Sequence, residues 1–379
     1  MNTPTIKLLL AVLALAPLAC SNAPKADTAK PDQTAAAPAP APTPAPPPAK
    51  PIPDGFHTLT PQLTVKGLDA AIEFYGKALG AQKLFVMAGP DGKPLHAEIK
   101  IGDSIIMLDE ENLAHGMKSP LALGGTPGQL MVYVPDADAA VATLTGAGAK
   151  VTLPLEDMFW GDRYGELVDP FGHTWAVATH LEDLTPEQTA ERGKLAMQPP
   201  PKGKKPKKGA PPAWKKIAGA PATEKQPKEY RTVTPAFTVA DAAAAIEFYK
   251  AAFGATEKYR MLGPDGKKVM HAELQIGDSA LMLTDTFAEM GGKNAGDLGG
   301  SPVALHYYVT DVDGVFAKAT GAGAKPAMPV ADQFWGDRYG LLVDPSGIPW
   351  GIATHKEDVP PEQMAERMKK QMQQAKPAS

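Results

Sequence analysis

A long internal repeat constrains the fold of this chain more than any other feature of its sequence. The sequence Phe-Trp-Gly-Asp-Arg-Tyr-Gly occupies residues 159–165 and returns at 334–340, an offset of 175 residues. Upstream, Ile-Glu-Phe-Tyr occupies 72–75 and returns at 246–249, an offset of 174 residues. A period of this length is that of a whole globular unit and not of a short solenoid repeat, so we expect two tandem copies of one domain.

Two proline-rich tracts delimit the copies. Eleven of the 40 prolines lie between Pro24 and Pro53, and eight lie between Pro199 and Pro227. Sequences rich in Ala and Pro favour extended polyproline II over helix or sheet, so we expect both tracts to be spacers. The expected division of the chain is a signal peptide (1–19), an Ala/Pro-rich linker (20–54), a first domain (55–181), a short helix with a Pro/Lys-rich linker (182–228), a second domain (229–356), and a C-terminal helix and tail (357–379).

The hydrophobic pattern within each copy predicts an α+β fold. Four apolar residues from Leu68 to Leu79 are spaced at four, three and four residues, which predicts a helix that ends at Gly80. The strands expected after this helix lie at about 83–88, 94–101 and 104–109. The same order begins again at Gln129, so each domain is expected to contain two βαβββ modules.

The first residues of the chain predict export. Lys7 precedes a 12-residue apolar run, Leu8–Ala19, which fits the apolar region of a secretory signal peptide. Cys20 follows this run and is the only cysteine, so the segment resembles a bacterial lipoprotein signal with Cys20 as the lipidated first mature residue. The alternative is an ordinary cleaved signal. We therefore expect the protein in the bacterial cell envelope, lipid-anchored to the membrane on the periplasmic side of the outer membrane, or secreted.

Composition excludes several other classes of protein. The formal net charge is −4, whereas a nucleic-acid-binding domain is usually basic, so no nucleic-acid partner is expected. A single cysteine rules out an intrachain disulfide framework and a multi-cysteine zinc site. The sequence also contains no run of about 20 apolar residues, so no ordinary transmembrane helix is expected.

Several short phrases fall in the same order in both copies. They are Ala-Ile-Glu-Phe-Tyr, His-Ala-Glu, Phe-Trp-Gly-Asp-Arg-Tyr-Gly and, in the first copy, Asp-Pro-Phe-Gly-His173. With the modular layout, they resemble the vicinal oxygen chelate (VOC) superfamily, which includes glyoxalase I, bleomycin- and fosfomycin-resistance proteins and extradiol dioxygenases, and within it the PhnB-like branch. The resemblance covers roughly 57–190 and 231–367. It implies domains whose modules curl around a cavity and which pack as an intrachain pseudo-dimer.

The resemblance also locates the positions at which metal-using members carry His or Glu ligands. These positions are Thr60, Glu98, Gln129 and Ala176 in the first copy, and Thr234, Glu273, Ala304 and Gly351 in the second. Only the two glutamates could ligate a metal. The resemblance therefore disfavours a divalent metal cofactor at the standard site, and with it the metal-dependent lyase chemistry of glyoxalase I.

Strand alternation points to other candidate ligand-binding residues. The polar or aromatic side chains expected on the cavity face are His96, Glu98, Tyr133, His271, Glu273, His306 and Tyr308. If a metal does bind, we expect it at His271, Glu273 and His306, since two imidazoles and a carboxylate suit a divalent ion. The alternative is that these are hydrogen-bonded pocket histidines.

The repeated Trp-Gly-Asp-Arg-Tyr sequence supplies the remaining candidates. An arginine beside an indole could clamp an anionic or aromatic ligand, which applies to Trp160, Arg163, Trp335 and Arg338. A structural turn is the alternative interpretation of this motif. No catalytic residue is assigned.

These observations favour an exported, lipid-anchored protein that binds a small molecule in its cavities. The first alternative is a VOC-type enzyme of the lyase, isomerase or dioxygenase class with a non-standard site in the second domain. The second alternative is an interaction protein whose cavities are vestigial.

Overall fold

The structure, a computed structural model, describes residues 49–89, 91–198, 212–263 and 265–374. The expected signal peptide, Cys20 and most of the first proline-rich tract lie outside the described residues. The lysine-rich stretch at 199–211 lies outside them too.

Each copy contains the two βαβββ modules that the sequence predicts. In the first copy they are β1 (Leu59–Val65), α1 (Leu68–Leu79), β2 (Gln82–Ala88), β3 (Pro94–Ile101) and β4 (Ser104–Glu110), then β5 (Gly128–Tyr133), α3 (Ala137–Gly146), β6 (Lys150–Asp157), β7 (Asp162–Val168) and β8 (Thr174–His180). In the second copy they are β11 (Val233–Val239), α5 (Ala242–Phe253), β12 (Thr256–Leu262), β13 (Val269–Ile276) and β14 (Ser279–Asp285), then β15 (Val303–Tyr308), α7 (Val312–Gly321), β16 (Lys325–Asp332), β17 (Asp337–Val343) and β18 (Pro349–His355).

Shorter elements connect the modules and extend each copy. They are η1 (Leu113–His115), α2 (Pro120–Leu123), η3 (Ala288–Met290) and α6 (Ala295–Leu298) between modules, and β9 (Glu182–Asp183), α4 (Pro186–Ala196), η2 (Ala213–Lys216), β10 (Ala220–Pro221) and α8 (Pro361–Gln374) after them. None of the helices in the described ranges is long and apolar enough to cross a membrane.

The modules that share a sheet come from different copies. One eight-stranded sheet, the first sheet, has the order β16-β17-β18-β15-β1-β4-β3-β2, and the second has the order β12-β13-β14-β11-β5-β8-β7-β6. The two copies join where β1 runs antiparallel to β15 and β11 runs antiparallel to β5. The expectation that one domain would curl its own two modules around a cavity is therefore wrong in its pairing. All four modules share one alternation pattern, so the sequence could not distinguish pairing within a copy from pairing between copies.

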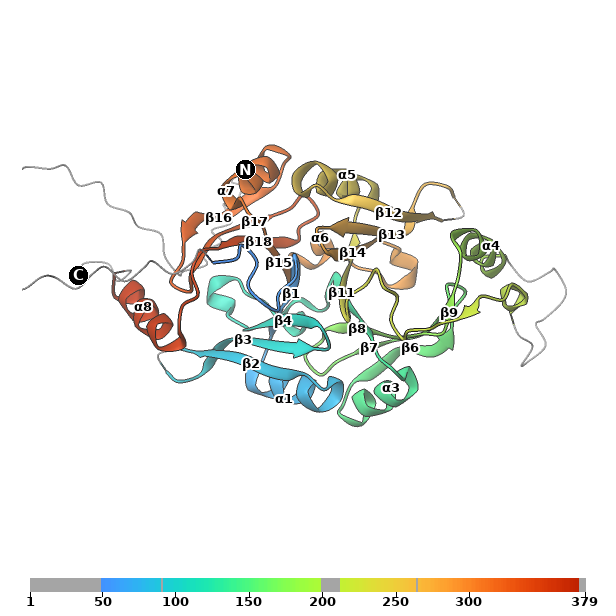
Figure 1. The fold of residues 1–379 in the computed structure, drawn as a ribbon, viewed down its shortest axis with the longest axis horizontal. Helices are drawn as coiled ribbons and strands as arrows, with labels where there is room; N and C mark the ends of the chain where they lie inside the picture. Colours follow the sequence, from blue (N-terminus) through green and yellow to red (C-terminus); the bar gives the residue numbers. More distant parts are fainter. Residues whose placement is uncertain (1–48, 90, 199–211, 264, 375–379) are drawn as a thin grey trace, which may run out of the picture.

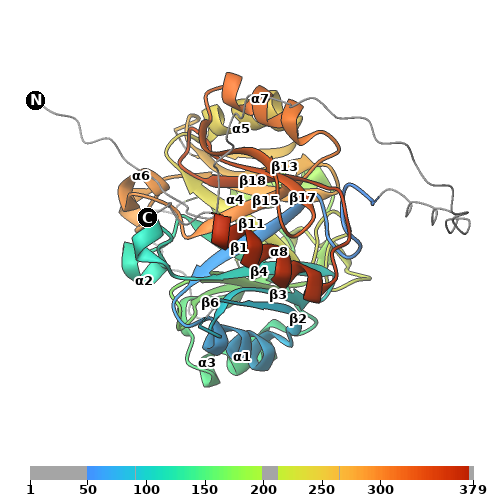
Figure 2. The ribbon, with the colours of Figure 1, turned by 90° about the vertical axis from the view of Figure 1, so that its left-hand side faces the viewer.

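Four helices, α1, α3, α5 and α7, cover the outer faces of the curved sheets. Helices α1 and α3 lie on one side of the molecule and α5 and α7 on the other, with the strands between them (Figures 1 and 2). The first sheet occupies the left of Figure 1 and the second sheet the right, and each runs from the lower helices to the upper ones. The face of each sheet that is turned away from the helices is called its inner face below.

The helix-covered faces form the core. The indoles of Trp175 and Trp350 are fully buried, and each donates its N–H at 3.0 Å to an aspartate, Asp169 or Asp344. The Tyr249 hydroxyl donates to the same Asp344 carboxylate at 2.6 Å. A buried carboxylate is tolerated only when it is hydrogen-bonded in this way. The sequence Asp-Pro-x-Gly, which occurs at 169–172 and again at 344–347, is therefore a structural feature.

A seam of reciprocal hydrogen bonds joins the copies with pseudo-two-fold symmetry. The N–H of Thr58 donates to the Asp278 carboxylate at 2.8 Å, and the equivalent N–H of Thr232 donates to Asp103 at 2.8 Å. Gly102 packs so closely on the Thr232 side chain that a Cβ there would lie 2.7 Å from its methyl carbon. Because both halves of the seam use the same bonds, the expected intrachain pseudo-dimer describes the arrangement of the two copies.

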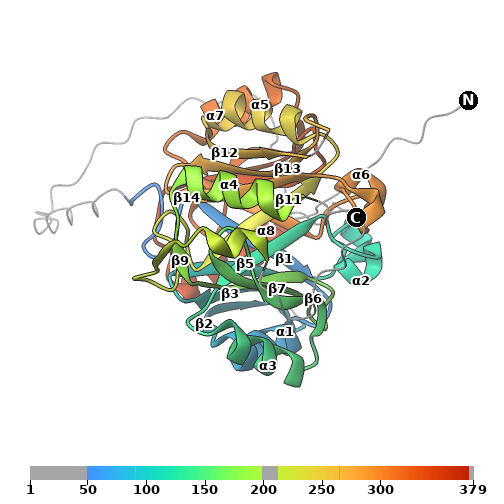
Figure 3. The same ribbon diagram turned by 90° about the vertical axis from the view of Figure 1, so that its right-hand side faces the viewer.

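The elements that follow each copy lie at opposite ends of the molecule, with α8 on the left and α4 on the right of Figure 1. Figure 3 shows α4 from outside, above the strands of the second sheet. The buried Arg192 of α4 pairs with Glu182 and lies 5.3 Å from the centre of the Trp214 ring. The described part of the Pro/Lys-rich linker therefore covers α4, which packs against the end of the first copy.

Candidate functional site

A hydrogen-bonded carboxylate organises one side of the inner face of the first sheet. Asp109 on β4 accepts hydrogen bonds from Gln62 on β1 and from His96 Nδ1 on β3, the latter at 2.8 Å. The second ring nitrogen of His96 lies 4.0 Å from the Glu98 carboxylate. Burial disfavours the imidazolium, but the hydrogen bond and charge of Asp109 and the charge of Glu98 outweigh it and raise the pKa of His96.

Glu98 lies in the middle of this face without a hydrogen bond from the described part of the chain. Its side chain is 23% exposed, so solvent reaches it. Burial raises the pKa of Glu98, and the negative charge of Asp337 opposes its ionisation further, although His96 acts in the opposite sense. The His96 ring at 4.0 Å is the charged group that favours its ionisation, and the carboxylate has no hydrogen-bonded partner among the described residues.

His306 on β15 lies on the same inner face and is 5% exposed. Its ring stacks on Tyr339 with 5.5 Å between ring centres and lies 4.5 Å from the ring of Tyr308. Burial lowers the pKa of His306 to about 4, so the imidazole is neutral at pH 7. Its Nε2 atom is buried and has no hydrogen-bond partner in the described structure.

The aspartate of the repeated Trp-Gly-Asp sequence holds the other side of this face together. Asp337 accepts hydrogen bonds from His355 at 2.7 Å, from the Trp335 indole at 3.1 Å and from the Tyr308 hydroxyl at 3.3 Å. The hydrogen bond to Asp337 raises the pKa of His355. Trp335 and Tyr308, both expected at a ligand site, are thus fixed on the inner face by one buried carboxylate.

The inner face of the second sheet is built from the equivalent positions with different chemistry. Its floor is an apolar cluster of Met131, Tyr133, Ala176, Ala178 and Met282. Tyr133 stacks on Tyr230 at 5.7 Å, and its hydroxyl donates to Asp162 at 2.9 Å. Trp160 packs edge-on against Tyr164 at the same end of this sheet.

Glu273 is the equivalent of Glu98 on this second face, and it is paired. His271 Nε2 lies 3.0 Å from its carboxylate, and the nearby Tyr230 hydroxyl also favours the ionised form of Glu273. Burial alone would raise the pKa of Glu273, but these hydrogen bonds and the charge of His271 lower it overall. The two equivalent glutamates, Glu98 and Glu273, therefore have pKa values shifted in opposite directions.

The expected metal trio of His271, Glu273 and His306 is not assembled. His271 and Glu273 lie on β13 in the second sheet, whereas His306 lies on β15 in the first sheet. The error follows from the cross-copy pairing of modules. Within the described ranges, no three His, Cys, Asp or Glu side chains lie together in a way that could hold a metal ion.

The family's metal-ligand positions regroup for the same reason. The first sheet carries Thr60, Glu98, Ala304 and Gly351, and the second carries Thr234, Glu273, Gln129 and Ala176. Tyr339 covers Gly351 so closely that a Cβ there would lie 2.6 Å from the tyrosine oxygen. A ligating side chain at position 351 would therefore displace Tyr339 from His306.

The repeated arginines lie on the outer faces. Arg338 donates to Asp313 at the start of α7 at 2.6 and 2.7 Å and to Asp332 at 3.2 Å. Arg163 makes the same pairs with Asp138 and Asp157. Because α7 and α3 cover the outer faces, the hypothesis that these arginines clamp a ligand on the inner faces is wrong. Asp337 and Tyr339 face inward, and Arg338 lies between them on β17. Strand alternation therefore indicates that Arg338 faces outward.

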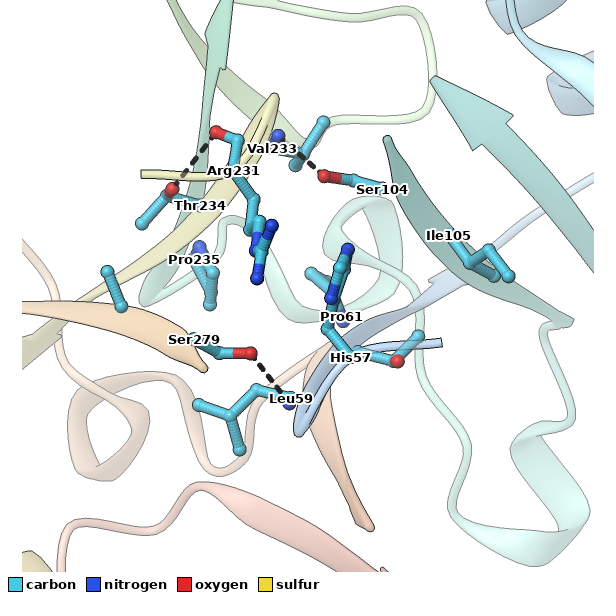
Figure 4. Close-up of a pocket in the computed structure, with 12 residues that line it drawn as sticks. His57, Leu59, Pro61, Ser104, Ile105, Arg231, Val233, Thr234, Pro235 and Ser279 are labelled. Carbon is cyan, nitrogen blue, oxygen red and sulfur yellow. Dashed lines mark hydrogen bonds between the residues drawn. The ribbon is translucent and has the colours of Figure 1, made fainter. Parts of the chain in front are cut away.

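A small recess lies on the pseudo-two-fold axis, between the starts of β1 and β11 (Figure 4). The equivalent residues His57 and Arg231 point into it from opposite sides, and both approach Asp278, at 2.7 and 3.0 Å. Its volume of about 10 Å³ is enough for about one water molecule. The inner face of the first sheet is therefore the better candidate for a ligand site.

Sequence reasoning missed three members of that face: Gln62, Asp109 and Tyr339. Gln62 lies two residues after Thr60 on its strand, so alternation could have placed it on the face of Glu98, whereas Asp109 follows the continuous apolar run 105–108 and has no such signal. Tyr339 was identified only as part of the repeated motif.

Comparison with known proteins agrees with this architecture. The family model of the Glyoxalase/Bleomycin resistance protein/Dioxygenase superfamily matches residues 55–177 and 232–352, so the chain belongs to this superfamily and carries two copies of its domain. The chain is 45% identical to an uncharacterized protein of Mycobacterium bovis over 130 residues, which are 34% of this chain and 85% of that protein. It is 32% identical to an uncharacterized Arabidopsis thaliana protein over 119 residues, 30% of this chain and 70% of that protein.

Among solved structures, glyoxalase I from Zea mays is similar to both copies together. The match covers 83% of this chain and 96% of the maize chain, with a TM-score of 0.52 and 15% sequence identity. At this identity the likeness concerns the fold alone.

Proposed function

We propose that this protein is an exported, lipid-anchored member of the superfamily that binds a small molecule on the inner face of a sheet, without the family's standard metal. One observation carries the proposal. The inner face of the first sheet keeps a partly open carboxylate, Glu98, and a buried imidazole nitrogen of His306 without partners, although three of the four metal positions cannot ligate. Polar groups left without partners in a folded protein cost stability, which a bound ligand would offset.

The residues present do not fit a metal-dependent reaction. Thr60, Ala304 and Gly351 leave Glu98 as the single ligand, and one carboxylate offsets little of the dehydration of a divalent ion. Purified full chain incubated with Zn²⁺, Ni²⁺ or Fe²⁺ and then dialysed should retain far less than one equivalent of metal. A thermal-shift screen of small molecules on the same sample should find compounds that raise the melting temperature. One tightly held metal per chain that is lost in Glu98→Gln would contradict the proposal.

The membrane location rests on the sequence, because Cys20 lies outside the described residues. A lone cysteine directly after an apolar run of signal-peptide length supports lipidation at that position. Wild-type protein expressed in a bacterium with two membranes should partition with the membrane fraction, and Cys20→Ser should not. An unmodified thiol in the intact mass of the mature protein would refute this part of the proposal.

A metal-independent acid–base enzyme is the second candidate. It is favoured by His96, whose ring is oriented by Asp109 and whose other nitrogen faces Glu98, because a general base needs such orientation. The two candidates differ in a simple observation: an enzyme converts a compound found in the thermal-shift screen, and a binding protein releases it unchanged.

A further inference from the structure

The two inner faces are built from equivalent positions, yet only one retains polar groups without partners. At three positions the first face carries the more polar residue. Gln62, Asp109 and His306 of the first face correspond to Ala236, Thr284 and Met131 of the second. Each of these changes replaces a group able to make strong hydrogen bonds with a smaller or less polar one, so the floor of the second face closes as an apolar cluster.

The change from Asp109 to Thr284 alters the direction of a histidine. In the first face His96 turns to Asp109 at 2.8 Å and leaves Glu98 at 4.0 Å. In the second face no aspartate stands at that position, and His271 turns to Glu273 at 3.0 Å. The Tyr230 hydroxyl also favours the ionised form of Glu273, and the counterpart of Tyr230 in the first face is Phe56, which has no hydroxyl.

The second face is thus satisfied internally, whereas the first face has two polar groups awaiting a partner. These are the Glu98 carboxylate, which is 23% exposed, and His306 Nε2, which is fully buried. The other carboxylates of the first face are already engaged, Asp109 by His96 and Asp337 by His355. Glu98 is therefore the carboxylate of this face whose nearest cationic group, His96, remains beyond hydrogen-bond distance at 4.0 Å.

The surroundings of Glu98 also favour a positively charged partner. Two charged groups act on Glu98, namely His96 and Asp337, and Asp337 is negative. Aromatic rings line the remainder of the face, with Phe56 edge-on to Tyr308 at 5.4 Å and Tyr339 against His306. Such rings attract cations through their π faces and accept apolar groups.

We propose that the inner face of the first sheet, and not that of the second, binds one small organic cation whose N–H groups donate to Glu98 and whose polar substituent reaches His306 Nε2. This inference rests on the proposed function and adds the ligand's charge and the choice between faces. An organic cation supplies both the charge and the donors that Glu98 lacks, and a charge-assisted hydrogen bond is roughly twice as strong as a neutral one.

The test uses the full chain and matched sets of probes. Benzylamine and benzamidine are the cations, benzyl alcohol and benzamide are their neutral counterparts, and benzoate is the anion. We expect the cations to bind with a stoichiometry of one per chain in calorimetry and to raise the melting temperature more than the other probes. Preference for benzoate, or binding of two cations per chain, would overturn the proposal.

Glu98→Gln and Glu273→Gln form a matched pair of variants at equivalent positions. Loss of a hydrogen bond to a charged group should weaken cation binding at least about tenfold in Glu98→Gln, and Glu273→Gln should bind as the wild type does. Equal weakening by both variants would overturn the assignment to the first face. His306→Met introduces the methionine that stands at the equivalent position 131, so the variant should still pack. It should weaken the binding of probes that carry an additional hydroxyl or amide.

Unliganded stability gives a readout that does not depend on the choice of probe. Glu98→Gln should leave the melting temperature unchanged or raise it, because it removes a partly buried charge that has no hydrogen-bonded partner, whereas Glu273→Gln should lower it. The reverse order would contradict the proposal. If neutral or anionic compounds stabilise the chain and cations do not, the cation inference fails while the proposed function stands; if no compound binds, the proposed function itself fails.

Discussion

The seam between the copies can be tested with one added methyl group. Gly277 has φ of +58° and packs against Thr58 of the other copy, where a Cβ would lie 2.7 Å from the threonine methyl carbon. Thr58 cannot easily move, because its N–H donates to Asp278 at 2.8 Å and its hydroxyl accepts from the Asp278 N–H at 3.2 Å. Gly277→Ala therefore strains both the backbone and the contact between the copies.

The expected magnitude is the sum of two effects. An alanine in the left-handed region costs about 1–2 kcal/mol. Overlap with a side chain that is held in place adds about 1–3 kcal/mol. The matched control is Gly80→Ala, because Gly80 has φ of +66° but a Cβ there would meet no atom within 4 Å. We expect the free energy of unfolding to fall by about 2–5 kcal/mol in Gly277→Ala and by about 1–2 kcal/mol in the control.

Urea unfolding followed by tryptophan fluorescence measures this difference. Trp175 and Trp350 are buried in the cores of the two copies, so their emission reports on both. With unchanged slopes, the midpoint of Gly277→Ala should lie clearly below that of Gly80→Ala. Equal midpoints would show that the copies do not meet at this contact, and the cross-copy seam would be refuted.

Three further predictions concern charges and packing around the cores. Burial would raise the pKa of Asp278, but hydrogen bonds from a backbone N–H and neighbouring side chains lower it overall. The contribution of Asp278 to stability is therefore present above about pH 4 and is lost as the pH falls. The urea midpoint should decline in acid, and this decline should be smaller in Asp278→Asn. Tyr249→Phe removes a 2.6 Å hydrogen bond from the buried Asp344 and should lower the free energy of unfolding by about 1–3 kcal/mol, measured in urea. Trp214→Ala uncovers Arg192, and hydrogen exchange of α4 should accelerate while the global midpoint changes little, because this helix lies at the end of the fold.

The strands and helices of each module could be predicted from the sequence because their signals are local. The apolar spacing from Leu68 to Leu79 and the stop at Gly80 match α1, and the helix after Asp136 begins where its side chain accepts the Ala139 N–H. The repeat at offsets of 174 and 175 residues also gave the number of copies and modules.

The pairing of modules could not be predicted, because it depends on contacts between residues more than a hundred positions apart. The seam of Thr58 with Asp278 has no local signature. The placement of His306 beside His271 was wrong for this reason alone, although the face of the strand on which His306 lies was inferred correctly. Alternation gives the side of a strand, and only the tertiary fold gives its neighbours.

The cross-copy sheets have a consequence for how such a protein can evolve. The Mycobacterium bovis relative aligns over 85% of its own length with about one copy. If two identical chains of that size paired as these copies do, one gene would supply both faces, and every substitution would appear in both at once. Joining the copies in one chain removes that coupling, because position 131 and position 306 are encoded separately. Met131 could then fill one face while His306 kept a polar nitrogen in the other, so a single gene can lose one ancestral pocket and adapt its twin.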